Sequence, residues 1–535
     1  MRATDLGGVG GGSAKGACTI GSLRSGLPSG WRLVTLRICP ERHFSTGAST
    51  MRLPQCVTNP TLVALIQGGG FPSLERFAQV VNVRGWQLQG IKLSYDHVSV
   101  RRWLTGGACQ NPDVVAAVLS EAWGVPVPVQ VIWPELRDGK GPAPAHLQAW
   151  VAARTLEDLA AFVGSDMLTR REVLSSSVGV ATGTGLVGPI ARWLDSEPAP
   201  LIGGVGGERV GLVDVERIEQ ATGHFMANDA AAGGGVCREA AVGQLKYAVD
   251  LARHGSYREA VGDRLMAAIA DLAGWVGWMS HDLAMAGPAQ HYLLYGLQAA
   301  RESRDERAQL RAIGLLADLA RQAEALGHPD TGLRLVDLAS DALPSDGRKL
   351  NKIRSLLWSL RAQMLAGMGH RYLPEVRSAI GLSFELYGQI SDEDRAPAVT
   401  ACFPYTSDAE LASSAATCYR RLSTEDPGLA GSAVAQALHA LSRRPQGFAR
   451  ARMFDQIELT RARFLAGEPD HAASDGETAL GMADRVSTSR RVAARLRELW
   501  RETEPYQAYG PVRTLRAGLR EALSGSSVGG ALRGS

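Results

Sequence analysis

The chain is poor in cysteine, and its cysteines form no motif. Seven of them are spread over 535 residues without a C-x-x-C pair, so their spacing indicates neither a zinc site nor a disulfide framework. Proteins without disulfides are typical of a reducing compartment. We therefore expect a cytoplasmic protein.

Long apolar runs are also missing. Arg170 and Arg171 begin a stretch with the form of a twin-arginine export signal. This stretch lies far from the N-terminus, however, and Gly, Ser and Thr interrupt the run that follows it. Because a membrane helix needs about 20 consecutive apolar residues, we expect no membrane segment.

No catalytic or cofactor motif is present. The glycine-rich stretch at 203–211 fits neither the dinucleotide fingerprint nor the phosphate loop. His281, Asp282 and His291 lie close in the sequence, but they do not supply the converging ligands of a metal site or a nucleophile with its base. We therefore expect no enzyme, no catalytic residue, no metal and no cofactor.

Charge is nearly balanced, with a formal net charge of +3 and a pI near 8.5. Hydrophobic residues make up 45% and charged residues 21%, which are ordinary globular values, and the length allows about three domains. Such a small net charge does not by itself indicate a nucleic-acid partner.

Composition and periodicity divide the chain into five parts. Residues 1–50 are rich in Gly and Ser and are interpreted as a disordered extension, or as sequence before a true start at Met51. Residues 51–136 form a small helical domain, 137–212 a linker with short helices, 213–523 a long helical domain and 524–535 a disordered tail. The predicted fold class is all-α.

The long helical domain has a repeat. Turns at Gly287, Gly327 and Gly369 are 40 and 42 residues apart, and Pro427 precedes Gly467 by another 40. A period of this length, built of helix, turn and helix, predicts a tetratricopeptide-like superhelix. The alternative is an irregular all-α domain.

Four short helices are predicted in 51–136. Residues 60–67 follow the N-cap Asn59, residues 74–82 follow the N-cap Ser73, a third helix follows Asp96 and stops before Gly106, and a fourth begins at Pro112. This order is typical of a helix-turn-helix domain.

The third helix has two different faces. Val100, Trp103 and Leu104 fall on one side and are assigned to the core. The opposite side carries the candidate DNA-binding residues, His97, Val98, Arg101 and Arg102. Arginine can pair with guanine and valine with a thymine methyl in the major groove. The alternative is a solvated basic face.

The charge of the domain argues for few phosphate contacts. Six basic residues face five acidic ones between Met51 and Glu135, whereas DNA affinity depends on phosphate neutralisation. A homodimer would compensate for this, because it doubles the number of phosphate contacts.

The motif V-x-x-W-L-x-G, here Val100, Trp103, Leu104 and Gly106, stands between a Phe-Ala helix and N-P-D-V-V-A-A-V-L-S-E-A-W-G. In this order the chain resembles large actinobacterial transcriptional regulators that join a Cro/repressor-type helix-turn-helix to a tetratricopeptide-like domain. That family includes negative regulators of sporulation and antibiotic production. One departure is a long insert, residues 83–94, between the second and third helices.

The resemblance implies a DNA-binding transcriptional regulator of development or secondary metabolism. Its helical-repeat groove would bind a protein or peptide partner. The alternative is a helical-repeat scaffold that does not itself bind DNA.

Overall fold

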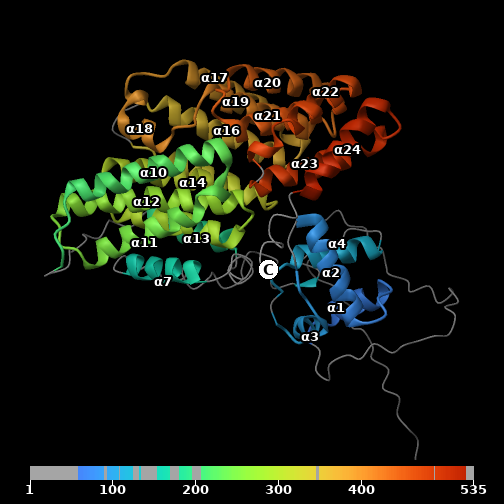
Figure 1. Ribbon diagram of the computed structural model, residues 1–535, viewed down its shortest axis with the longest axis horizontal. Helices are drawn as coiled ribbons and strands as arrows, with labels where there is room; N and C mark the ends of the chain where they lie inside the picture. The colour runs from blue at the N-terminus through green and yellow to red at the C-terminus, as the bar shows by residue number, and fades with distance from the viewer. Residues whose placement is uncertain are drawn as a thin grey trace, which may run out of the picture. The chain divides into compact units, whose positions relative to one another are not determined.

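The computed structural model describes residues 58–89, 93–107, 109–123, 132–133, 154–168, 180–194, 207–344, 349–486 and 488–525. Within these ranges the regular structure is helical (Figure 1), with one isolated β-bridge between Arg209 and Ser256. The predicted all-α class is confirmed. The predicted extension at 1–50 and most of the predicted tail lie outside the described residues.

The N-terminal domain contains α1 (Pro60–Gly68), α2 (Leu74–Gln89), α3 (His97–Leu104) and α4 (Pro112–Trp123). The Asn59 side chain accepts a 3.0 Å hydrogen bond from the N–H of Leu62, and Ser73 accepts one of 3.1 Å from Arg76. Both predicted N-caps are therefore present. Buried apolar side chains from all four helices form one core, including Leu62, Ile66, Phe77, Val81, Val100, Trp103, Leu104, Val114, Val118 and Leu119.

The second helix is longer than predicted. It continues past residue 82 to Gln89, so more than half of the segment interpreted as an insert is helix. Asn82 does not end the helix. Its side chain instead bonds the backbone of Tyr95, donating to the carbonyl at 2.7 Å and accepting from the N–H at 2.8 Å.

Two helices from the predicted linker belong to the long helical domain. Leu159 and Val163 of α7 (Thr155–Leu168) and Leu186 and Ile190 of α9 (Thr184–Leu194) are fully buried in its main core. The assignment of 137–212 as a connector is therefore wrong for these two helices. Residues 137–153, 169–179 and 195–206 of that segment lie outside the described residues.

Helices α10 to α24 follow one another with short turns (Figure 1). Their bounds are α10 (Leu212–Ala232), α11 (Arg238–His254), α12 (Glu259–Asp282), α13 (Ala286–Arg301), α14 (Glu306–Ala325), α15 (Pro329–Asp341), α16 (Asn351–Gly367), α17 (Leu373–Gly388), α18 (Pro397–Cys402), α19 (Asp408–Leu422), α20 (Ala430–Arg443), α21 (Ala449–Leu465), α22 (Pro469–Leu480), α23 (Arg490–Glu502) and α24 (Gly510–Gly525).

These helices form a two-layered array of pairs. Each of α12, α14, α16, α19 and α21 packs against the helix that follows it, and these first helices also contact one another in succession. Stacking of this kind is what helical repeats use to bury a continuous core. The identity of the repeats as tetratricopeptide-like stays a prediction.

Most of the predicted turns are correct. Gly327, Gly369 and Gly467 lie between helices with φ of 86°, 107° and 76°, values that only glycine adopts readily. Gly287 was placed wrongly, because it lies inside α13. The turn before α13 is at Ala284, which takes a φ of 58°.

Helices that are far apart in the sequence also contact each other in the array. Asp229 of α10 and Arg450 of α21 are buried and share two hydrogen bonds of 2.7 Å. Asp282, at the end of α12, accepts a 2.9 Å hydrogen bond from Ser489, just before α23. In a simple solenoid each repeat contacts only its neighbours, so these contacts between distant helices set this domain apart.

Candidate nucleic-acid interface

The start of α3 is fixed by a capping box. The Asp96 carboxylate accepts hydrogen bonds of 2.8 Å from both the N–H and the hydroxyl of Ser99, and the N–H of Asp96 donates back to that hydroxyl at 3.5 Å. These hydrogen bonds lower the pKa of Asp96. An N-cap of this kind satisfies backbone donors that the first turn leaves unpaired.

The end of α3 is also fixed, by a glycine turn and backbone hydrogen bonds. Gly106 adopts a φ of 89°, and the N–H of Gly107 donates to the Arg102 carbonyl at 2.7 Å, as in a Schellman motif. The Leu104 carbonyl accepts from the N–H groups of Thr58 and Asn59 at 2.9 and 3.1 Å. The start of α1 is therefore tied to the end of α3.

The inner face of α3 is anchored by an aromatic pair. Trp103 is 3% exposed and meets the Tyr95 ring edge to face, with 4.8 Å between centroids. The Tyr95 hydroxyl accepts a 2.7 Å hydrogen bond from Asn111, which precedes α4, and burial raises the pKa of Tyr95 to about 12. Together with the Asn82 bonds, this links α2, α3 and α4.

The outer face of α3 carries the four candidate residues. His97, Val98, Arg101 and Arg102 are all exposed, Val98 by 57%. No described residue forms an ion pair with Arg101 or Arg102. The predicted division of the helix into a buried and an outward face is therefore confirmed, while the DNA-binding role of the outward face stays a prediction.

Gly107 has a role that the sequence alone did not reveal. A Cβ atom at this position would lie 2.3 Å from Cγ and 2.8 Å from the carbonyl oxygen of Arg102. Since such contacts are too short, any side chain here would displace Arg102. Two adjacent glycines indicated only the end of a helix; the first supplies the turn, and the second leaves room for the arginine.

The helical array contains a small cavity. Its volume is about 100 Å³, and its lining includes Trp275, Trp278, Arg311, Asp318, Phe403 and Tyr405 from α12, α14 and the segment between α18 and α19. Tyr405 also donates a 3.2 Å hydrogen bond to the Met226 carbonyl of α10. The array therefore contains a hollow lined by aromatic and charged side chains, while the partner groove stays a prediction.

Of the two histidines considered as possible ligands, His281 is buried and His291 is partly buried. His281 is 9% exposed, and its pKa is well below the usual value, because burial and then the charges of Arg491 and Arg450 disfavour the imidazolium. Asp282 is engaged with Ser489 and Arg450. The described part of the chain contains no cluster of three His, Cys, Asp or Glu side chains able to hold a metal ion.

Comparison with known proteins adds one similarity. The sequence profile of the SP15 N-terminal domain matches residues 62–132, which begin inside α1 and include α2, α3 and α4. No curated protein and no solved structure matches the chain. None of the described helices combines the length and apolar character needed to cross a bilayer.

Proposed function

We propose that the protein is a DNA-binding transcriptional regulator in which α3 contacts base edges in the major groove. The observation that carries this proposal is the outward face of α3. It presents His97, Val98, Arg101 and Arg102 on a helix that is capped at both ends and anchored by Trp103. Recognition requires a helix held in a fixed position, and the two caps and Trp103 hold α3 in place.

Each residue has a role that suits its chemistry. Arg101 and Arg102 are suited to donate bidentate hydrogen bonds to O6 and N7 of guanine. Val98, one turn earlier, is suited to an apolar contact with a thymine methyl. His97 lies beside the N-cap at the start of the helix, the part that usually approaches the bases.

The helical array is the part proposed to bind a protein or peptide. Its inner cavity offers aromatic rings for an apolar side chain and arginine and aspartate groups for polar ones. The resemblance described above suggests genes of development or secondary metabolism as targets. A homodimer would double the DNA contacts of the weakly charged N-terminal domain.

A scaffold without direct DNA binding is the second candidate. It is favoured by the small excess of basic residues between Met51 and Glu135, six against five. A domain that binds DNA by itself usually has a clearer basic surface.

The test compares two changes on the same helix. Arg101→Ala with Arg102→Ala should remove sequence discrimination, because each bidentate arginine contributes about 1–3 kcal/mol of it, and should leave the melting temperature nearly unchanged. Trp103→Ala should unfold the N-terminal domain, since it removes a large buried side chain at about 3–5 kcal/mol.

Binding is measured by fluorescence anisotropy on a fragment selected from genomic DNA by the wild type and on a scrambled fragment. Arg217→Ala with Arg395→Ala, at two exposed positions on the helical array, is the control for net charge. A folded Arg101/Arg102 variant with normal discrimination would contradict the proposal. Wild-type protein that selects no fragment yet captures a protein partner would favour the scaffold.

A further inference from the structure

Helix α23 has three distinct faces. Val492, Leu496 and Leu499 are buried in the C-terminal core. A second face carries Glu498 and Glu502, whose carboxylates bond Arg461 of α21 at 2.8 and 2.5 Å. Both glutamates of the helix are therefore committed to a partner inside the array.

The third face carries only arginine among its charged residues. Arg490, Arg497 and Arg501 are seven and four positions apart, so at about 100° per residue they fall within about 40° of one another. With a rise of about 1.5 Å per residue the row is about 16 Å long. We call these three residues the arginine row.

The charges of the row crowd one another. Arg490 and Arg501 are exposed and Arg497 is half-buried. The pKa of Arg497 is lowered by its partial burial and then by the charges of Arg501 and Arg490. Arg490 is also the first residue of α23, where the helix dipole disfavours a cation.

The surrounding sequence adds to the positive charge. From Arg490 to Arg520 there are eight arginines and three glutamates, and two of those glutamates are the ones bonded to Arg461. This is a stronger excess than that of the whole N-terminal domain. Two of these arginines are bonded within the array, Arg495 to Glu498 and Arg516 to the Trp500 carbonyl, whereas Arg490, Arg501, Arg513 and Arg520 are exposed. Exposed positive charge attracts a polyanion.

We propose that the arginine row contacts the phosphate backbone of the DNA bound by α3; this inference rests on the proposed function. Guanidinium groups pair with phosphates in a bidentate geometry. The row also supplies the phosphate neutralisation that the N-terminal domain lacks, and because both surfaces belong to one chain, the second contact raises the affinity of the first.

Two other anionic partners fit less well. An amphipathic membrane-surface helix needs an exposed apolar face beside its cations, whereas the apolar face of α23 is buried. An acidic peptide holds its carboxylates on a flexible chain, whereas the phosphates of a DNA duplex form a regular array along a stiff backbone. Both become outcomes of the test.

The variant is Arg490→Gln with Arg497→Gln in the full chain. The control is Arg217→Gln with Arg395→Gln, which removes the same net charge at positions where Asp214 and Asp392 already compensate it. The affinity for selected and scrambled DNA should fall by the same factor. Because each lost phosphate contact lowers the slope of log K against log salt by about 0.9, the slope should decrease by about 1.8.

A slope equal to that of the control pair overturns the inference. So does an unchanged DNA slope combined with arginine-dependent binding to anionic phospholipid vesicles or polyglutamate. Failure of the proposed function looks different: wild-type protein would bind selected and scrambled DNA equally, while its slope would still depend on Arg490 and Arg497. Circular dichroism confirms that each variant keeps its helix content.

Discussion

Replacing Asp229 with Ala tests whether the helical array is closed by the contact between α10 and α21. The substitution removes a fully buried carboxylate and leaves the Arg450 guanidinium without its two 2.7 Å partners. Breaking a buried ion pair by removing one member costs about 3–5 kcal/mol. Arg450 keeps a second carboxylate, Asp282, at 3.5 Å, so we expect the lower end, about 3 kcal/mol.

Hydrogen–deuterium exchange, resolved by peptide, is the suitable assay, because a chain of several domains does not unfold in one step. A loss of about 3 kcal/mol corresponds to exchange that is roughly 100-fold faster. We expect this acceleration in α10, α21 and α23 together, although they are far apart in the sequence. Helices α1 to α4 should be unaffected.

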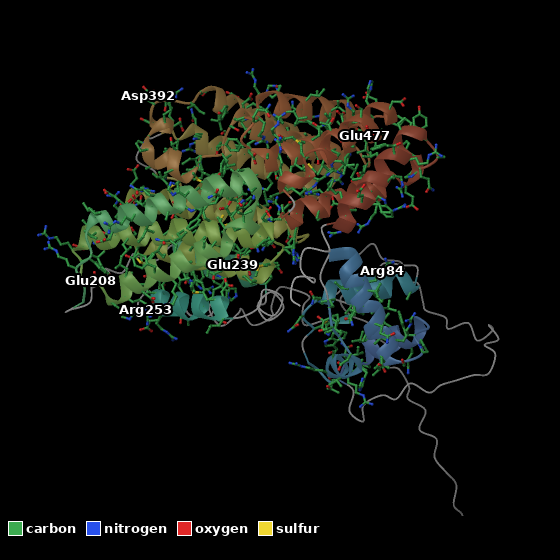
Figure 2. The ribbon with its side chains drawn as sticks, viewed as in Figure 1. Arg84, Glu208, Glu239, Arg253, Asp392 and Glu477 are labelled. Atoms are coloured by element: carbon green, nitrogen blue, oxygen red, sulfur yellow. The ribbon has the colours of Figure 1, made fainter. Side chains whose placement is uncertain are left out.

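Two control variants test whether the effect comes from the unpaired buried charge. Asp229→Leu with Arg450→Met removes both charges and should cost less than the single change, since paired apolar replacements are often nearly neutral. Asp392→Ala breaks an exposed pair with Arg395 and should change nothing, because Asp392 projects into solvent (Figure 2). Faster exchange confined to α10 after Asp229→Ala would refute the closed arrangement.

Two further predictions concern the same domain. A fragment of residues 154–525 should melt at a higher temperature than 213–525, because the shorter one lacks Asp166, which bonds the buried Arg238 at 2.6 and 3.2 Å; equal midpoints would contradict this. The folded state disfavours protonated His281, so the unfolded chain gains a proton as the pH falls below about 6.5, and stability is lost from that pH downward. His281→Gln should lessen the drop in melting temperature between pH 7.5 and 5.5, and an unchanged drop would refute this assignment.

Local rules predicted α3 well. An Asp N-cap, apolar residues at helical spacing and two following glycines specify a short helix from chemistry within a dozen residues. The end of α2 could not be found in this way, because Asn82 is used by Tyr95 on the other side of the turn. A residue that often ends helices continues one here, since its side chain has a partner elsewhere.

Contacts between distant parts of the sequence could not be predicted from the sequence. Asp229 and Arg450 are 221 positions apart, and nothing near either residue indicates the other. The docking of α7 through Asp166 and Arg238 was missed for the same reason, and the segment was interpreted as a linker. The arginine row could not be found from the sequence. Its excess of positive charge becomes apparent only when Glu498 and Glu502 are known to bond Arg461.

Chromatin immunoprecipitation of the tagged protein tests the central proposal most directly. Wild-type protein should enrich a small set of discrete genomic fragments. The Arg101→Ala, Arg102→Ala variant, present in equal amount and equally folded, should lose that enrichment, because the side chains proposed to contact guanine are gone. The same discrete fragments enriched by the variant, or no discrete fragments enriched by the wild type, would contradict the assignment of α3 as the helix that recognises DNA.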